Sequence, residues 1–466
     1  MPTIQLKDLT YQYSKTNETI FKAATVTFPA AQLSLITGPS GCGKSTLLEI
    51  IAGFDENSKL QKQLYFDDKV ATSIAAPDKT KLVSMMFQDP NQQFVMQTVA
   101  EELTFALENI QTKAENIAQR VQTALAFCEI EKLRDRQILT LSGGEKQKVI
   151  LATMVALDSD IFLLDEPFAS IDLKSKHEIL TKLVQLKQEQ GKTIIISDHD
   201  LSGYQAIVDE IFQINPEQKK IVQLSKKEKV AVLTPANNEQ LHFGIPTTEP
   251  LFNFSDFQLL AQQQPLLNLD NFTIHSGCTL LTGESGIGKS TLFQSLAKLK
   301  NYVGSARLDE TEIKKIKAQK LYDHLALVFQ NANDQFLEVT VAEELKIAEQ
   351  TALTNHWNAN KIQTALTQLG LANKQDQVVY TLSGGQKKKL QILLMLIRDP
   401  EILLLDEPFA GLDLNSVKTI QHLLQTEFGA RNRALIVISH QIFQFDHFFD
   451  YHLQFANQSL NYREVI

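Results

Sequence analysis

Hydrophobic residues along this chain follow two alternating patterns. Short runs rich in branched apolar residues, such as 33–37, 161–164 and 193–197, have the length and composition of buried strands. Longer stretches, such as 117–128, space their apolar residues as an amphipathic helix does. Strands that alternate with helices predict an α/β fold, in which a mostly parallel sheet is covered by helices.

The pattern occurs twice in the chain. The motif Gly-Xaa4-Gly-Lys-Ser-Thr stands at 38–46 and again at 283–291. Later pairs recur at one spacing of 241 positions: Ser142 and Ser383, Asp165 and Asp406, Asp172 and Asp413, His199 and His440. A repeat this long indicates two whole domains, because solenoid repeats run about 20 to 50 residues. We expect a helical insert in each domain, between 88 and 141 and between 330 and 382.

The boundary between the domains is predicted after residue 224. Residues 225–250 combine a cluster of three lysines at 226, 227 and 229 with one glycine and three prolines, which is typical of a linker. We therefore predict a first domain at 1–224, a linker at 225–250 and a second domain at 251–466.

Composition narrows the class of protein. The chain is 43% hydrophobic and 21% charged, as expected for a folded soluble protein. No stretch approaches the roughly 18 apolar residues that span a bilayer, and the N-terminus lacks a signal-peptide pattern, so we expect neither membrane crossing nor export. Cys42, Cys128 and Cys278 form no CxxC pair, which favours a reducing compartment without disulfides. The net charge of -9 argues against a nucleic-acid partner.

The repeated glycine motif predicts a phosphate-binding loop between a strand and a helix. Its glycines let backbone NH groups converge on phosphate oxygens at the helix N-terminus, the lysine reaches the outer phosphates, and the serine can ligate magnesium. The residues expected to bind nucleotide here are Gly38, Gly41, Gly43, Lys44, Ser45 and Thr46 in the first half and Gly283, Gly286, Gly288, Lys289, Ser290 and Thr291 in the second.

A second motif is an apolar strand that ends in two acids, at 161–167 and 402–408. The first acid, Asp165 or Asp406, is placed to enter a magnesium shell. The second acid, Glu166 or Glu407, can orient or deprotonate an attacking water. Phosphoryl transfer needs mainly positioning and charge neutralisation, which such groups supply.

A third motif, Leu-Ser-Gly-Gly, opens a lysine-bearing helix in each half. The serine is a helix N-cap, and the two glycines leave their NH groups available for a phosphate. The residues concerned are Ser142, Gly143 and Gly144 in the first half and Ser383, Gly384 and Gly385 in the second.

Together these motifs resemble the ATP-binding cassette ATPase family, and the resemblance covers both halves nearly end to end. It implies two tandem P-loop NTPase domains that bind ATP with Mg²⁺. In that family the Ser-Gly-Gly motif of one domain closes over ATP held by the phosphate loop of the other, so the resemblance implies intramolecular pairing of the two cassettes and two composite sites.

The resemblance also implies roles for further residues. Gln88 and Gln330 match the glutamine loop, which links magnesium and water to a membrane partner, and His199 and His440 match the switch histidine. Residues 170–172 and 411–413 match the family's contact loop between domains. Tyr13 fits the adenine-stacking aromatic, whereas the corresponding place in the second half is expected to read Asp256-Phe-Gln. Because lysine, glutamate and histidine occur in both halves, both sites are expected to hydrolyse ATP.

The segments after the two glutamines resemble the ATPases of energy-coupling factor transporters, which import vitamins and transition-metal ions. They run from Gln92 to Phe105 and from Asp334 to Leu345. The resemblance implies that they line grooves for a transmembrane scaffold at the cytoplasmic face of the membrane, beside a substrate-binding membrane subunit. Charge reversal at Glu101 and Glu102 is expected to weaken that docking. The plainer alternative is a helical subdomain with surface glutamines.

Two other functions stay open at this stage. A tandem ATPase of a sugar importer has similar length, but a different segment is expected after its glutamine. A ribosome-associated cassette protein also has two cassettes, but a longer, charged helical arm is expected between them than 225–250 provides. Purification from membranes or from ribosomes would separate these alternatives. The imported compound is bound by a separate membrane protein in this family, so its identity lies in that subunit.

Overall fold

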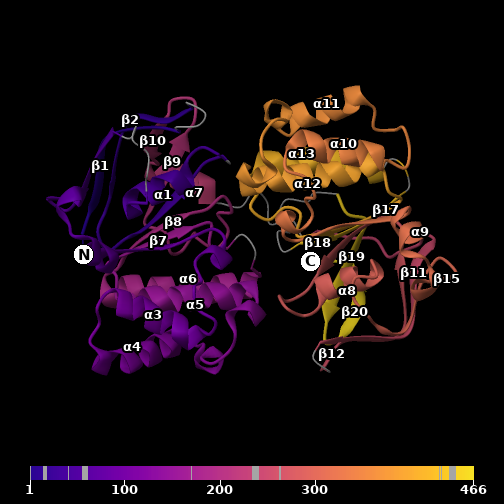
Figure 1. Cartoon of the computed structure of the whole chain (residues 1–466), viewed down its shortest axis with the longest axis horizontal. Helices are drawn as coiled ribbons and strands as arrows, with labels where there is room; N and C mark the ends of the chain where they lie inside the picture. Colours follow the sequence, from indigo (N-terminus) through magenta and orange to yellow (C-terminus); the bar gives the residue numbers. More distant parts are fainter. Residues whose placement is uncertain are drawn as a thin grey trace. The chain divides into compact units, whose positions relative to one another are not determined.

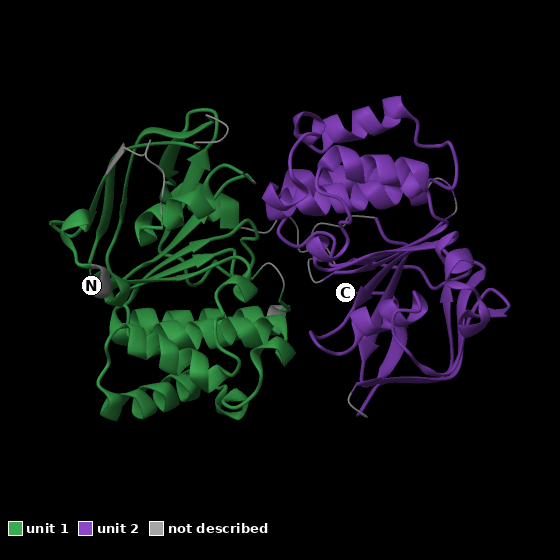
Figure 2. Ribbon diagram, in the orientation of Figure 1, with its two compact units in different colours: residues 1–237 green, residues 238–466 purple. Residues whose placement is uncertain are grey.

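The chain folds into two compact units, residues 1–237 and 238–466, which Figure 2 colours separately. The computed structural model describes residues 2–13, 18–39, 41–54, 61–168, 171–233, 241–261, 264–429, 431, 433–439 and 448–465. Within these ranges, no helix is both long and apolar enough to cross a membrane. Each unit has the predicted α/β architecture.

The first unit contains two sheets and the helices that cover them (Figure 1). Its strands are β1 (Ile4–Gln12), β2 (Thr19–Phe28), β3 (Leu33–Thr37), β4 (Gln61–Phe66), β5 (Lys69–Val70), β6 (Val83–Met86), β7 (Ile161–Asp165), β8 (Thr193–Ser197), β9 (Glu210–Asn215) and β10 (Lys220–Gln223). Its helices are α1 (Lys44–Ala52), α2 (Ala76–Leu82), α3 (Val99–Asn109), α4 (Ala114–Phe127), α5 (Gly143–Leu157), α6 (Leu173–Gln190) and α7 (Lys226–Leu233).

The larger sheet of this unit has the order β10-β9-β3-β8-β7-β6, and its pairs from β9 to β6 are parallel. Both faces of its central strands are buried, because side chains alternate between two cores. Ile194 and Ile196 of β8 face the core shared with α3 to α6, whereas Ile195 faces the core shared with α1, β1 and β2. Figure 1 shows α3 to α6 together on one side of this sheet and α1 on the other.

The smaller sheet of the first unit has the order β2-β1-β4-β5, and its pairs are antiparallel. The second unit repeats both sheets, as β12-β11-β14-β15 and β16-β17-β18-β13-β19-β20. Its strands are β11 (Pro250–Ala261), β12 (Gln264–His275), β13 (Cys278–Thr282), β14 (Val303–Leu308), β15 (Thr311–Glu312), β16 (Leu325–Val328), β17 (Ile402–Asp406), β18 (Ala434–Ile438), β19 (Tyr451–Ala456) and β20 (Ser459–Arg463). Its helices are α8 (Lys289–Leu296), α9 (Ala318–Tyr322), α10 (Val341–Gln350), α11 (Ala359–Gln368), α12 (Gly384–Arg398) and α13 (Leu414–Leu424).

The predicted helical inserts are present in both units, as α3 and α4 in the first and as α10 and α11 in the second. Each insert begins with a capping box, in which Thr98 or Thr340 caps the first turn and the glutamate three residues later returns the bond. A threonine followed by the sequence Val-Ala-Glu-Glu therefore fixes where each helix starts.

Residues 225–250 contain more structure than a linker composition suggests. Helix α7 lies within them, and its Leu233 packs against the core of the first unit. Phe243 belongs to the second unit, since its NH donates to the carbonyl of Glu464 at 2.8 Å. The exact domain boundaries at 224 and 250 stay predictions.

Candidate active site

The phosphate loop of each half lies between a buried strand and a helix, as predicted. In the first half it joins β3 to α1, and in the second it joins β13 to α8. Gly41 and Gly286 have φ values of +79° and +78°, in the left-handed region that favours glycine. A Cβ added at either position meets no atom within 4 Å, so the space beside the loop is open to a ligand.

The loop lysines are buried and held inside their loops. Nζ of Lys44 donates to the carbonyl of Gly38 at 3.1 Å, and Nζ of Lys289 donates to the carbonyl of Gly283 at 2.7 Å. Lys44 also lies 3.4 Å from a carboxylate oxygen of Glu166. The ammonium group of Lys44 could exchange these bonds within its own loop for bonds to an anionic ligand.

The acid-tipped strands bring both predicted carboxylates of each half to the end of the phosphate-loop sheet. Asp165 ends β7 and accepts a bond from Oγ of Ser197 at 2.5 Å. Asp406 ends β17, and its Oδ1 is buried without a partner among the described residues. Burial raises the pKa of both aspartates. A buried carboxylate oxygen without a partner, such as Oδ1 of Asp406, is suited to a cation.

The two glutamates have an unusual backbone conformation. The φ values of Glu166 and Glu407 are +42° and +49°, in the left-handed region where non-glycine residues are rare. The NH of Glu166 donates to the carbonyl of Ser197 at 2.9 Å, and the NH of Glu407 donates to that of Ile438 at 3.0 Å. Such strain is held by the surrounding structure and clusters at functional sites. No pattern in the sequence indicates this backbone conformation.

In the first half, Glu166 is surrounded by the other predicted residues. Nε2 of Gln88 donates to Oε2 of Glu166 at 2.9 Å, and Nδ1 of His199 lies 3.8 Å from that oxygen. Burial works to raise the pKa of Glu166, but His199 and Lys44 together outweigh it, so that pKa is lowered. Glu166 therefore stays ionised, which suits a group that accepts a proton.

His199 is held by a residue that sequence reasoning missed. Burial works to lower the pKa of His199, but the carboxylates of Glu166 and Asp198 outweigh it and raise that pKa. Asp198 is itself buried and accepts bonds from the NH of His199 at 2.7 Å and from the hydroxyl of Tyr204 at 2.8 Å. Nε2 of His199 has no partner among the described residues, so it is available to a ligand. His440, the matching histidine, and Ser170 lie outside the described residues.

The third motif forms the predicted helix caps. Oγ of Ser142 accepts from the NH of Glu145 at 3.3 Å, and Oγ of Ser383 accepts from the NH of Gln386 at 3.4 Å. These bonds start α5 and α12, respectively. In the same way, Asp172 caps α6 and Asp413 caps α13.

The expected counterpart of Tyr13 was wrong. Asp256, with φ +47°, matches Asp8, with φ +52°, because both stand at the same bend of equivalent strands. The NH of Tyr13 donates to the carbonyl of Glu18, and Ala261 has the same place opposite Gln264. Ala261 therefore replaces Tyr13, and an alanine offers no ring for stacking. The hydroxyl of Tyr13 lies 2.6 Å from Oγ1 of Thr46.

Glu101 and Glu102 make bonds within their own segment, and their expected role in docking stays a prediction. Glu101 closes the capping box of α3, and its carboxylate accepts from the NH of Thr98 at 2.9 Å. Glu102 is buried and accepts from the NH groups of Val95 and Met96, at 3.0 and 2.9 Å. Glu101 is exposed, whereas Glu102 holds the segment from inside.

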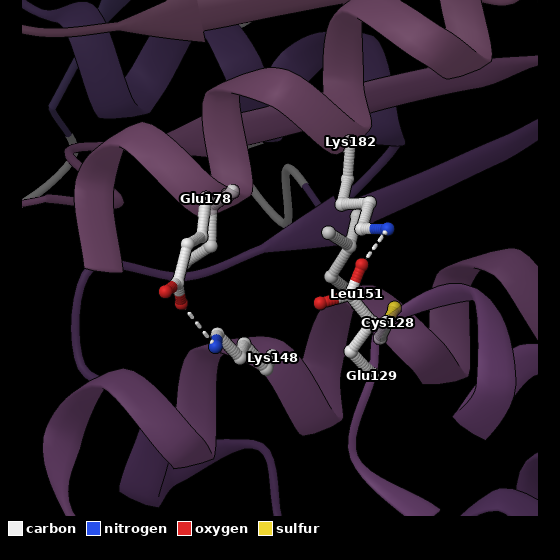
Figure 3. Close-up of a pocket in the computed structure, with 7 residues that line it drawn as sticks. Cys128, Glu129, Lys148, Leu151, Glu178 and Lys182 are labelled. Atoms are coloured by element: carbon white, nitrogen blue, oxygen red, sulfur yellow. Dashed lines mark hydrogen bonds and ion pairs between the residues drawn. The ribbon is translucent and has the colours of Figure 1, made fainter. Parts of the chain in front are cut away.

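A small pocket elsewhere in the first unit has no part in this chemistry. Figure 3 shows it, with ion pairs Lys148 to Glu178 at 2.5 Å and Lys182 to Glu129 at 2.6 Å. Its volume of about 10 Å³ suits at most one water molecule. Burial raises the pKa of its Cys128 to about 12, so this thiol is unreactive. The described residues also contain no group of three His, Cys, Asp or Glu side chains that would hold a metal without a nucleotide.

Comparisons with known proteins agree with this geometry. A family model described as ABC transporter matches residues 21–169 and 267–410. A Bacillus subtilis ATP-binding protein, provisionally assigned to HMP/thiamine import, is 28% identical over 480 residues, which cover 94% of this chain and 87% of that protein. A Treponema denticola protein, provisionally an ABC transporter ATP-binding protein, is 29% identical over 459 residues, which cover 93% of this chain and 91% of that protein.

Solved structures share the fold of the whole chain. A structure of ribosome-bound archaeal Pelota and ABCE1 has a TM-score of 0.71 at 18% identity and covers 98% of this chain and 78% of that one. A structure of RNase-L inhibitor has a TM-score of 0.65 at 20% identity and covers 99% of this chain and 90% of that one. At such identities the likeness concerns the fold alone.

Proposed function

Since this chain belongs to the ABC transporter family and is an ATPase, we propose that it drives an importer of the energy-coupling factor class. Its cargo in this proposal is a vitamin or a metal ion. The segments after Gln88 and Gln330, which resemble that class, support the assignment. The HMP/thiamine assignment of the Bacillus subtilis relative is consistent with a vitamin.

One observation carries the proposal: in each half, an exposed apolar patch is formed by the segment after the glutamine loop and the segment just before the Ser-Gly-Gly motif. The first patch consists of Val95 and Leu139, which are 66% and 89% exposed. A bond from the NH of Ile138 to the carbonyl of Gln97 holds their segments side by side. Apolar side chains this exposed are suited to a partner surface.

The second apolar patch consists of Leu337, Val339, Val378 and Tyr380. Leu337 is 79% exposed and Val339 is 58% exposed. The NH of Val379 donates to the carbonyl of Val339 at 2.9 Å, which places the two segments together. Because the patch recurs at the equivalent place in both halves, we propose that each receives a helix of a transmembrane scaffold.

ATP and Mg²⁺ fit the residues at both sites. The open loops at Gly41 and Gly286 suit phosphates, and a hydroxyl and a carboxylate from Ser45 and Asp165 are the oxygen ligands that Mg²⁺ prefers. The unpartnered Oδ1 of Asp406 supports the same role in the second half, with Ser290. Gln88 and Gln330 are proposed to complete the two metal shells. Bound Mg²⁺ would neutralise phosphate charge.

The chemistry of this chain is then water activation beside the γ-phosphate. We propose that Glu166 and Glu407 take the proton of the attacking water, and that Gln88 and His199 orient the first of these carboxylates. His440 and Gln330 have the matching roles in the second half. The lysines and the loop NH groups stabilise the charge that develops on the phosphate.

The proposal includes partners and a location. The chain would act at the cytoplasmic face of the cell membrane, attached to a transmembrane scaffold and next to a separate substrate-binding membrane subunit. It would bind no nucleic acid. Its two cassettes would pair within the chain, so that each ATP is shared by the phosphate loop of one half and the Ser-Gly-Gly motif of the other.

The test is to replace one residue of each patch. Leu139→Asp with Leu337→Asp should lower the yield of co-purifying membrane proteins about tenfold or more, since charged side chains at an apolar contact centre are costly. ATP binding by the isolated chain should stay unchanged. Leu299→Asp is a matched control, because Leu299 is 51% exposed and lies outside both patches. An unchanged complex yield in the double variant would contradict the proposal.

A further inference from the structure

The helix that begins at the Ser-Gly-Gly motif differs in its interior between the two halves. Lys388 follows Ser383 by five residues on α12, and Gln147 follows Ser142 by five residues on α5. Both side chains are buried, with 7% and 3% exposed. A lysine in place of a neutral amide puts a full charge inside the second half, which requires compensating partners.

Lys388 finds these partners on the glutamine loop. Its Nζ donates to the carbonyl of Gln330 at 2.6 Å and to that of Phe329 at 3.1 Å. Hydrogen bonds from an ammonium are stronger than those from a neutral donor. The backbone at the start of the glutamine loop is therefore tied directly to α12.

A second side chain of α12 strengthens this tie. Nε2 of Gln391 donates to the carbonyl of Phe329 at 3.0 Å and to Oε1 of Gln335 at 2.7 Å. Oε1 of Gln335 also accepts from the NH of Phe329, at 3.2 Å. The loop is thus held by two side chains of one helix face.

The charge of Lys388 also acts on the catalytic acids. Burial lowers the pKa of Lys388 to about 8, while the charges of Asp406 and Glu407 oppose that shift. The amine is accordingly protonated at neutral pH. It contributes a buried positive charge that interacts with the carboxylates of Asp406 and Glu407.

The first half shares only part of this arrangement: Oε1 of Gln93 accepts from the NH of Phe87 at 2.8 Å, and Nζ of Lys146 on α5 donates to Oδ1 of Asn91 at 2.8 Å. Among the described residues, no side chain of α5 donates to the carbonyl of Phe87 or Gln88. Ile150 replaces Gln391 and has no donor, and Oε1 of Gln147 is buried without a partner among the described residues. There the loop is held from the other side, through the bond from Gln88 to Glu166. The two glutamine loops are therefore supported differently.

We propose that Lys388 is a positioning residue of the second half only, which holds the backbone of Gln330 against α12 so that hydrolysis at Glu407 depends on it. Hydrolysis at Glu166 does not depend on Lys388. The two ATP sites are then unequal, and a displacement at the start of α12 passes directly to the backbone of Gln330 in the second half. This inference rests on the proposed roles of Gln330, Glu166 and Glu407.

The experiment separates the two sites by their carboxylates. Lys388→Met keeps the shape of the side chain and removes its charge and its donors. It is made in the Glu166→Gln chain, which retains the site of Glu407, and in the Glu407→Gln chain, which retains the site of Glu166. Single-turnover hydrolysis, with the full chain in excess over ATP, reports the intact site even where steady cycling needs both.

We expect Lys388→Met to slow hydrolysis about tenfold in the Glu166→Gln chain, as expected for a misplaced positioning group. In the Glu407→Gln chain the rate should change less than about twofold, and ATP affinity should be unchanged in both. Lys387→Met, on the same helix, controls for loss of a lysine, and thermal unfolding of every variant checks that it is folded.

Equal slowing in both backgrounds, or no slowing in either, would overturn the role of Lys388. A failure of the proposed function would give a different experimental result. If neither Glu166→Gln nor Glu407→Gln by itself lowers hydrolysis, the assignment of the carboxylates is wrong, and the inference about Lys388 is wrong with it.

Discussion

Nε2 of Gln88 donates a hydrogen bond to Oε2 of Glu166 at 2.9 Å, across 78 positions of sequence. The amide comes from the segment after β6 and the carboxylate from the end of β7, and these two strands are parallel neighbours in the sheet. The sheet thereby joins the segment that precedes the first apolar patch to the residue proposed to activate water. A partner that moves the glutamine loop would therefore also shift the carboxylate of Glu166, through this hydrogen bond.

The first prediction concerns that carboxylate and its counterpart. Glu166→Gln together with Glu407→Gln should lower ATP turnover by about 10²-fold or more, because a neutral amide cannot accept the proton of water. ATP binding should persist or tighten, since Gln keeps the shape of the side chain. Phosphate release and nucleotide retention measure the two effects. Hydrolysis near the wild-type rate in the double variant would sink the assignment.

A second prediction follows from Ala261 at the place of Tyr13. Tyr13→Ala should weaken nucleotide binding at the first half by roughly tenfold, because stacking of a base on an aromatic ring contributes about 1–3 kcal/mol. Tyr13→Phe is the control, since it loses only the hydroxyl bonded to Thr46. Calorimetry on hydrolysis-blocked chains should resolve two unequal classes of site in the wild type and nearly equal ones in Tyr13→Ala. Two equal classes in the wild type would refute the asymmetry.

The proposed sharing of each ATP between the halves gives a third prediction. If sites are composite, Lys44→Ala with Ser383→Ala damages one site, and about one nucleotide per chain should remain trapped in a hydrolysis-blocked background. Lys44→Ala with Ser142→Ala then damages both sites, and trapping should fall towards zero. If instead Lys44→Ala with Ser142→Ala kept one trapped nucleotide and Lys44→Ala with Ser383→Ala kept none, each Ser-Gly-Gly motif would serve its own half.

Glu102 provides a fourth prediction, on stability. Glu102→Gln removes the negative charge from Oε2, the one oxygen that accepts from the NH groups of both Val95 and Met96, and the loss of a charged acceptor in the interior costs about 1–3 kcal/mol. The midpoint of thermal unfolding should fall accordingly. Glu108→Gln, an exposed site on the same helix, should leave it unchanged. Equal midpoints for both variants would show that Glu102 has no structural role.

The motifs could be predicted because each is contiguous in sequence and performs its role locally. The phosphate loop needs its own glycines and lysine, and the acid at the tip of β7 needs only the apolar strand before it. The fold class followed from the alternation of strands and helices, and the structure has it in both units.

What sequence missed depends on pairing between distant segments. The phosphate loops of the two halves are 245 positions apart, but Asp8 and Asp256 on the equivalent strands are 248 apart, so one constant offset misplaced the counterpart of Tyr13. Glu102 was expected to contribute to docking, but its carboxylate is buried and accepts a hydrogen bond from the NH of Val95. Lys388 was predicted only as one lysine of a lysine-bearing helix, because its carbonyl partners lie 59 and 58 positions away in sequence.

The most direct test of the account is to purify the tagged chain from its native cells and identify what accompanies it. Detergent-solubilised membranes and ribosomal fractions should be processed in parallel. We predict that integral membrane proteins, including a scaffold and a smaller substrate-binding subunit, co-purify from the membrane fraction and are lost with Leu139→Asp and Leu337→Asp. Co-purification with ribosomal proteins, and with no membrane protein, would contradict the account.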